Sequence, residues 1–217
     1  MNPLIPLLKI GKREVSERQP PLIIAEIGIN HAGNIDKAIQ MIDDVADAGG
    51  ECVKFQCHIL EDEMIPNEVV PGNSDKTIWQ IISEAVLSEE EEWSLKKYAE
   101  QKKLLYLCTP FSRAAAKRLE RMSVAAFKIG SGECNNYPLI KHIASFGKPI
   151  ILSTGMNDLE TIKPAVEIFR ASACGFALLQ CTSVYPTPYH LVNLGALEEL
   201  GINFPDAVLG LSDHSIG

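Results

Sequence analysis

The chain has 217 residues, of which 46% are hydrophobic and 22% are charged, and its formal net charge is −8 at pH 7. These proportions are typical of a folded globular protein, and the length fits one domain with a sizeable core. Because acidic residues outnumber basic ones and no basic patch dominates, the composition argues against nucleic-acid binding and against attachment to an anionic membrane surface.

Six cysteines are spread along the chain without a Cys-x-x-Cys pair, and several lie in apolar segments. We interpret them as reduced residues of the core. No apolar segment approaches the roughly 18 residues of a membrane span, and the N-terminus lacks the apolar core of a signal peptide. We therefore expect a cytoplasmic protein with no membrane partner.

Short aliphatic runs alternate with longer amphipathic segments, and residues 1–20 are interpreted as an N-terminal flap. The expected strands are 22–27, 52–57, 104–108, 125–129, 149–153, 176–181 and 207–211. The expected helices are 34–48, 88–103, 112–121, 136–146, 158–171 and 190–200. The longest interruption, residues 58–87, is expected to lie as a loop over the mouth of the fold, with one short apolar stretch near 78–82.

Alternation of strands and helices predicts parallel pairing of buried strands. Seven such strands fit either an open doubly wound sheet or most of a barrel. The first strand lacks a G-x-G-x-x-G turn, and polar residues end nearly every strand, which favours the barrel. Since a closed barrel needs an eighth strand and typically about 250 residues, we predict that residues 21–217 form a (β/α)₈ TIM barrel truncated after strand seven.

Two lysines lie within the expected strands, and the neighbours of each are apolar. The alternation of side chains along a strand directs these neighbours toward the helices, and Lys54 and Lys128 toward the barrel axis. Two lysines that face one cavity repel each other unless an anion lies between them. The pattern therefore predicts an anion site, although either lysine alone could simply reach water at a strand tip.

Hydroxyls and carboxylates occupy other strand ends. Thr109, Ser131 and Ser153 end strands three to five and could complete an anion site. Glu26 lies in an aliphatic run, where a solvated charge is improbable, and Glu133 follows strand four. Such carboxylates can bind sugar hydroxyls, hold a metal-bound water or transfer protons.

Among the histidines, His214 is the best candidate for a metal ligand, because it follows strand seven and imidazole suits divalent transition metals. One histidine cannot make a metal site, so further ligands must come from elsewhere. For His31, after strand one, a functional and a structural role remain equally open. His58, His142 and His190 are expected at the surface.

Seven segments add a more specific signal. They are IAEIGINH at 24–31, VKFQ at 53–56, TPFS at 109–112, KIGSGECNNYPL at 128–139, ILSTGM at 151–156, YPTP at 185–188 and GLSDH at 210–214. In this order they closely resemble the bacterial sialic acid (N-acetylneuraminate) synthases, and the resemblance covers residues from about 20 to the end. The run at 71–73 is similar to the family's sugar-contacting segment.

The resemblance implies a metal-dependent (β/α)₈ enzyme that condenses phosphoenolpyruvate with N-acetylmannosamine to give N-acetylneuraminate and phosphate. It implies that Lys54, Thr109, Lys128, Ser131 and Ser153 hold phosphoenolpyruvate, that Asn73, Glu133 and Tyr185 contact the N-acetylated amino sugar, and that Gln56 and Ser212 line the pocket. Glu26 is then expected to work beside the metal, and His214 to be one of two histidine ligands, usually to Mn²⁺, with Mg²⁺ or Co²⁺ as alternatives.

The chain departs from the family pattern in three ways. Ser183 and Val184 precede Tyr185 where some members have Asn, which leaves one sugar contact open. The resemblance places a second metal histidine on strand eight and a C-terminal antifreeze-like domain after the barrel, and both are expected to be absent here. A homodimer is expected for the full-length enzyme. The alternatives are a legionaminic or pseudaminic acid synthase, a Schiff-base aldolase that uses Lys128, or a non-catalytic fragment.

Overall fold

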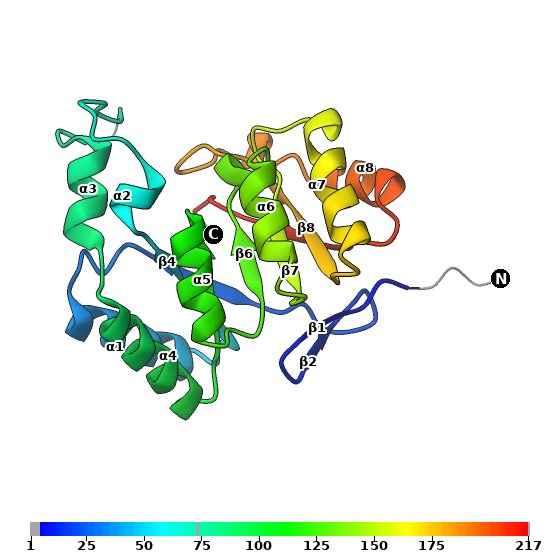
Figure 1. Cartoon of the computed structure of the whole chain (residues 1–217). Helices are drawn as coiled ribbons and strands as arrows, with labels where there is room; N and C mark the ends of the chain where they lie inside the picture. The colour runs from blue at the N-terminus through cyan, green and yellow to red at the C-terminus, as the bar shows by residue number, and fades with distance from the viewer. Residues whose placement is uncertain (1–4, 73, 217) are drawn as a thin grey trace. The chain divides into compact units, whose positions relative to one another are not determined.

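The computed structural model describes residues 5–72 and 74–216, which belong to two compact units (Figure 1). One unit consists of residues 22–124, and the other combines residues 1–21 with 125–217. Each unit is built around a parallel sheet, so the chain is an α/β protein. No helix in the described part of the chain is both long and apolar enough to span a membrane.

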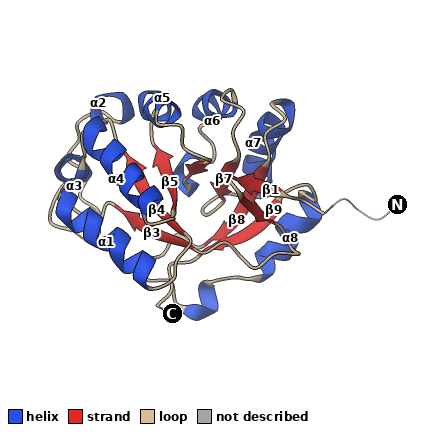
Figure 2. Cartoon of the chain, turned by 90° about the horizontal axis from the view of Figure 1, so that it is seen from below, coloured by secondary structure: helices blue, strands red, loops and turns tan. Residues whose placement is uncertain are grey.

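The unit of residues 22–124 contains a three-stranded parallel sheet in the order β3-β4-β5. Its strands are β3 (Ile24–Gly28), β4 (Cys52–Cys57) and β5 (Leu105–Pro110). Its helices are α1 (Ile35–Asp47), α2 (Leu60–Glu63), α3 (Ile78–Ala85), α4 (Glu89–Gln101) and α5 (Arg113–Arg121). Helices α1 and α4 pack side by side on one face of this sheet, as Figure 2 shows.

The other unit contains a four-stranded parallel sheet in the order β6-β7-β8-β9 and a separate antiparallel hairpin. The hairpin pairs β1 (Leu8–Ile10) with β2 (Arg13–Val15), and the sheet consists of β6 (Phe127–Ile129), β7 (Ile150–Ser153), β8 (Phe176–Cys181) and β9 (Val208–Ser212). The helices are α6 (Tyr137–Ala144), α7 (Leu159–Ala171) and α8 (Gly195–Asn203), with 3₁₀ turns η1 (Ser131–Glu133) and η2 (Tyr189–Leu191). Helices α6 and α7 pack side by side.

Polar side chains fix the helix starts at the expected places. Asn34 accepts a hydrogen bond from the Lys37 backbone N–H at the start of α1, and Asp158 caps α7 in the same way. Ser88 and Glu91 form a reciprocal capping box at the start of α4. Each cap satisfies a backbone N–H group that the first helical turn leaves without a partner.

The strands carry the core. Strands β6 and β7 are buried along their whole length, as expected for parallel strands with both faces covered. All six cysteines are buried and free, which confirms their interpretation as reduced core residues. Burial raises the pKa of both Cys52 and Cys134 to about 12, so these thiols stay protonated at neutral pH.

All seven expected strands and five of the six expected helices are confirmed, with boundaries shifted by at most a few residues. The expected helix at 190–200 is confirmed only from Gly195 onward. The chain forms η2, then Asn193 adopts a left-handed conformation with φ of 53°, and α8 begins only at Gly195. The expected loop at 58–87 contains α2 and α3, and the N-terminal flap contains the β1–β2 hairpin.

Candidate functional site

A buried lysine lies at the carboxyl end of the β3–β5 sheet. The strand register pairs Glu26 with Lys54, and Gln56 with Thr109. The Lys54 ammonium forms an ion pair with the Glu26 carboxylate and donates to Thr109 Oγ1 at 3.4 Å. Lys54 is only 7% exposed, so its charge is compensated inside the protein by a carboxylate and a hydroxyl. Lys54 is therefore buried, and its predicted direction toward a barrel axis stays a prediction.

Glu26 itself is less shielded than its aliphatic surroundings predict. Its side chain is 47% exposed, and the expectation that this carboxylate avoids water is wrong. The reason is its place near the end of β3, where the carboxylate reaches the Lys54 ammonium at the sheet edge while water still has access. Glu26 therefore presents a charge that is both paired and open to solvent.

Gln56 lies beside a buried histidine, His58, for which the sequence predicts a surface position. His58 is 5% exposed, and its Nε2 lies 3.0 Å from Gln56 Oε1. Its Nδ1 lies 2.8 Å from Glu63 Oε2, and its ring stacks on Phe111 with a centroid distance of 4.4 Å. The surface expectation for His58 is wrong because the short helix α2 turns the chain back and brings Glu63 to the imidazole.

His31, for which the sequence leaves two roles open, has structural contacts. It is almost fully buried, its Nδ1 accepts a hydrogen bond from the Gly33 backbone N–H at 3.1 Å, and its ring lies 5.9 Å from that of Phe55. Burial, and secondarily the charge of Lys37, lowers the pKa of His31, which favours the neutral imidazole. These contacts support the structural role.

A second buried lysine lies in the β6–β9 sheet. The Lys128 ammonium donates to Ser153 Oγ at 2.6 Å and to the Ile129 carbonyl at 2.8 Å. Lys128 is 4% exposed and Ser153 is 2% exposed. The phenyl ring of Phe127, its neighbour on β6, stacks on Phe146 just after α6, as expected if Lys128 points to the opposite face.

Ser131 is held against the turn that follows β7. Its Oγ accepts a hydrogen bond from the Gly155 backbone N–H at 3.0 Å, and its carbonyl accepts one from Asn157 Nδ2 at 2.9 Å. A Cβ atom at Gly155 would lie only 2.7 Å from Ser183 Oγ and 2.9 Å from Ser131 Oγ. Only glycine therefore allows these two serines to approach the turn so closely.

Glu133, expected to contact a sugar, lies in η1, where it accepts a hydrogen bond from Asn136 Nδ2 at 2.6 Å. Asn136 also caps α6 with its side-chain oxygen. The carboxylate is therefore oriented by the residue that begins the next helix.

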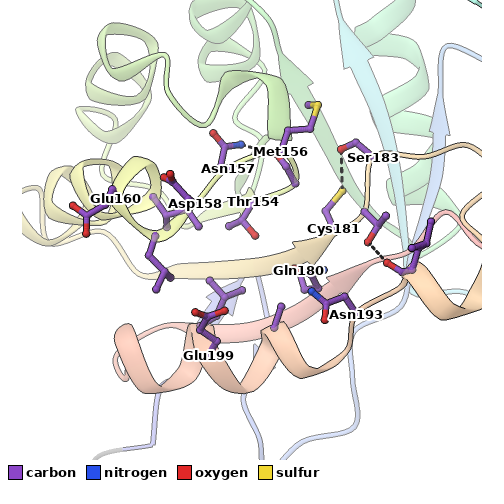
Figure 3. Close-up of a pocket in the computed structure, with 17 residues that line it drawn as sticks. Thr154, Met156, Asn157, Asp158, Glu160, Gln180, Cys181, Ser183, Asn193 and Glu199 are labelled. Atoms are coloured by element: carbon purple, nitrogen blue, oxygen red, sulfur yellow. Dashed lines mark hydrogen bonds between the residues drawn. The ribbon is translucent and has the colours of Figure 1, made fainter.

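A cavity of about 610 Å³ lies at the carboxyl ends of β7 and β8 (Figure 3). Asp158, Glu160 and Glu199 contribute carboxylates to its wall, and Figure 3 shows the side chains of Cys181 and Ser183 pointing toward each other. Neither Lys128 nor Ser153 lines this cavity. Its acidic wall disfavours an anion, so it differs chemically from the predicted anion site.

His214 and Tyr185 lie together. Their ring centroids are 4.1 Å apart, and His214 Nδ1 lies 3.0 Å from the Thr182 carbonyl oxygen. A carbonyl can only accept, so Nδ1 donates to it, and Nε2 is the ring nitrogen turned away from this contact, an arrangement common in histidine metal ligands. Tyr185 is 68% exposed, and Ser212 ends β9 partly buried.

The sequence-predicted residues thus form three groups: Glu26, Lys54, Gln56 and Thr109; Lys128 and Ser153, with Ser131 and Glu133 nearby in sequence; and Tyr185 with His214. Asn73 lies outside the described residues. Lys54 and Lys128 belong to different units, so their common cavity stays a prediction. Across residues 5–72 and 74–216, no group of three His, Cys, Asp or Glu side chains could hold a metal ion.

Buried lysines that donate to strand hydroxyls, with a carboxylate beside one of them, thus lie in the parallel sheets of an α/β protein. Residues 41–217 match the model of the NeuB family, and the chain belongs to that family. It is 33% identical to human (Homo sapiens) N-acetylneuraminate-9-phosphate synthase, over 94% of this chain and 58% of the relative. It is 35% identical to N,N'-diacetyllegionaminic acid synthase of Campylobacter jejuni, over 90% of this chain and 61% of the relative.

Among solved structures, that of N-acetylneuraminic acid (sialic acid) synthetase from Leptospira borgpetersenii, in complex with citrate, is similar with a TM-score of 0.89. The match has 30% identity and covers 100% of this chain and 73% of that one. The chain spans 54–61% of the length of eight curated relatives that it matches.

A substitution at Gly28 tests how closely the side chains of Glu26 and Gln56 approach this glycine. It has φ of 57°, and a Cβ there would lie 3.2 Å from Glu26 Oε1 and 3.6 Å from Gln56 Nε2. Gly49 has φ of 77° with no atom within 4 Å, so Gly49→Ala measures the backbone strain alone. We expect each alanine to lower the free energy of unfolding in urea by about 1–2 kcal/mol. Only Gly28→Ala should also shift the side-chain amide signals of Gln56 in a ¹H–¹⁵N spectrum, and unchanged signals would contradict this geometry.

Proposed function

We propose that the protein containing this chain is a phosphoenolpyruvate-dependent nonulosonic acid synthase. In the reaction we favour, it condenses phosphoenolpyruvate with N-acetylmannosamine to give N-acetylneuraminate and phosphate. The observation that carries this proposal is the pair of buried lysines, each bonded to a strand-end hydroxyl, in a chain of the NeuB family. The names of the relatives support the reaction class, and the citrate in the similar synthetase supports a site for a carboxylate anion.

We also propose that the seven parallel strands belong to one (β/α)₈ barrel. Each sheet is parallel, and its strands follow one another in chain order, as barrel strands do. The structural match to the Leptospira synthetase over the whole chain supports the same arrangement. In such a barrel, Lys54 and Lys128 would face one mouth, where catalytic residues of this fold gather.

In the proposed site, Lys54 with Thr109, and Lys128 with Ser131 and Ser153, hold the carboxylate and the phosphate of phosphoenolpyruvate. Carbon 3 of phosphoenolpyruvate forms a bond to the aldehyde carbon of the open-chain sugar; the C2=C3 double bond is lost, and the aldehyde oxygen takes up a proton to become a hydroxyl. Water then adds at the cationic carbon 2 and gives up a proton, and the bond between carbon 2 and the phosphate oxygen breaks, which releases phosphate and leaves a ketone. The lysines stabilise the anionic groups throughout, because their positions are already fixed by burial and hydrogen bonds.

The amino sugar is assigned to the more exposed polar residues. Glu133 and Tyr185 would contact it together with Asn73, and Gln56 and Ser212 would line the pocket. Asn136 orients the Glu133 carboxylate, which supports a fixed hydrogen-bond acceptor for a sugar hydroxyl. Exposure of Tyr185 leaves its ring accessible to a ligand.

A divalent metal, Mn²⁺ above Mg²⁺ or Co²⁺, belongs to the proposal, and only part of its site fits the described residues. The Thr182 carbonyl holds Nδ1 of His214, so Nε2 would be the ligating nitrogen, and Glu26 would work beside the ion. One imidazole is not a metal centre, and the described residues hold no group of three ligands. When bound, the metal would act as a Lewis acid on the sugar aldehyde.

The cytoplasmic setting is part of the same proposal, supported by six free, buried cysteines, which suit a reducing compartment. The homodimer of the full-length enzyme stays a prediction.

A legionaminic acid synthase is the second candidate, favoured by the 35% identity to the Campylobacter enzyme. The test is release of phosphate from phosphoenolpyruvate by the full-length protein with N-acetylmannosamine and, separately, with the amino-sugar precursors of legionaminic and pseudaminic acid. We expect release that depends on one sugar, and the preferred sugar decides between the candidates. Absence of release with every sugar, or a pyruvate adduct trapped by borohydride, would overturn the proposed reaction.

Lys128→Ala in the full-length protein should lower the rate of phosphate release about 10²–10³-fold, because it removes a preorganised charge from the phosphate. Lys141→Ala, which removes an exposed lysine from α6, is the matched control and should leave the rate unchanged. Steady-state kinetics measure both variants. Near-normal turnover by Lys128→Ala would mean that Lys128 is structural only.

The 217-residue chain by itself should bind Mn²⁺ weakly and turn over little, because its described residues offer one well-placed imidazole and a catalytic site needs several ligands in fixed geometry. Calorimetry on this chain and on a variant extended through an eighth strand measures the difference. Equal, tight binding by both would place a complete metal site within these residues.

A further inference from the structure

We infer that His58 and Glu63 act as positioning residues for Gln56. They fix its side-chain amide so that the NH₂ group faces the space above Gly28, beside Glu26, where it donates a hydrogen bond to an oxygen of the amino sugar. This role rests on the proposed function, and it assigns a task to a buried histidine and a carboxylate that the proposed reaction does not otherwise use.

The imidazole of His58 is restrained on every side. Nδ1 lies 2.8 and 3.0 Å from the two oxygens of Glu63, Nε2 lies 3.0 Å from Gln56 Oε1, and the ring plane is nearly parallel to that of Phe111, at 13°. The side chains of His58 and Glu63 are 4% and 9% exposed. Burial of both partners makes their contact strong and leaves the ring no freedom to turn.

The contact to His58 determines which way the Gln56 amide points. Because Oε1 faces the imidazole, the NH₂ group must face the other way. The same placement turns Nε2 toward Gly28: a Cβ atom there would lie 3.6 Å from Gln56 Nε2 and 3.2 Å from Glu26 Oε1. The space above Gly28 is therefore bordered by an N–H donor and a carboxylate acceptor, a combination that suits the hydroxyl and carbonyl oxygens of an N-acetylated sugar.

The contacts on both sides of the ring explain why the amide keeps this orientation. The Glu63 carboxylate can only accept, so Nδ1 donates to it, and Nε2 faces the Gln56 Oε1 acceptor at 3.0 Å. An amide turned round would instead place its NH₂ group against the ring. Glu63 and His58 thus select whether Gln56 presents a donor or an acceptor to the site.

Helix α2 is held by a hydrogen bond to α5, which fixes the position of Glu63. Asp62 Oδ2 accepts a hydrogen bond from the Ala114 backbone N–H at 3.0 Å, in the first turn of α5. Ser112 caps the same turn through Ala115. The start of α5 therefore holds α2, and α2 holds Glu63 against His58.

A purely structural role for His58 makes a different prediction from a positioning role. Loss of a structural contact lowers the stability of the protein and does not discriminate between the two substrates. Loss of a positioned donor weakens binding of the amino sugar alone. The two roles therefore differ in whether only KM for the sugar rises.

Two substitutions of His58 form a matched pair in the full-length protein. His58→Gln keeps an N–H donor near the position of Nε2, whereas His58→Asn keeps one only near Nδ1. We expect His58→Asn to raise KM for the amino sugar about tenfold, with KM for phosphoenolpyruvate unchanged, and His58→Gln to restore most of the loss. Gln56→Ala should give a similar rise, and His58→Asn added to it should give no further change.

Glu63→Gln serves where a His58 variant fails to fold, because it keeps an acceptor oxygen for Nδ1 and removes only the charge. It should raise the sugar KM in the same selective way. An unchanged sugar KM, equal rises for both substrates, or additive effects of His58→Asn and Gln56→Ala would each overturn the inference alone. A wild-type protein that releases no phosphate with any sugar would overturn the proposed function and this inference together.

Discussion

Two ammonium groups lie inside aliphatic strands, and the arrangement of the polar residues around them follows from the need to compensate those charges. An isolated buried charge costs several kcal/mol, so each lysine must find acceptors within reach of its own strand. Lys54 finds a carboxylate on β3 and a hydroxyl on β5, and Lys128 donates to a hydroxyl on β7 and to the carbonyl of the next residue. The same compensation leaves charge and donors available at the strand ends, where a ligand can approach.

Strand register turns this constraint into geometry. In parallel strands, pairing of Glu26 with Lys54 and of Gln56 with Thr109 follows once the aliphatic positions are aligned on the buried face. A shift of one residue would direct Lys54 into the helical layer, where Phe55 stacks on Tyr106. The hydrophobic pattern that folds the sheet therefore also determines which polar side chains meet at its edge.

The dependence of polar contacts on the hydrophobic pattern explains how much of the structure could be predicted from the sequence. The strands, the burial of Lys54 and the reduced cysteines follow from alternation and burial, which are local patterns. The burial of His58 does not, because its partner, Glu63, lies five residues away, a spacing that matches neither a strand nor a regular helix face. Only α2, anchored by Asp62 to the distant start of α5, brings the two together, and no pattern in residues 58–63 shows that contact.

The distinction between contacts set by strand patterns and contacts made by loops also separates two parts of the proposed site. Apart from Ser131 in η1, the groups assigned to the phosphate and carboxylate lie on strands, where register fixes them, so short motifs suffice to indicate the family. The groups assigned to the sugar depend on contacts made by loops and turns: Asn136 to Glu133, the Tyr185 ring against His214, and His58 to Gln56. Such contacts can change with a single substitution while the strands stay the same. Relatives that share the anion-binding motifs can therefore differ in the sugar they use, and the residues that orient these polar groups are the place to look for that difference.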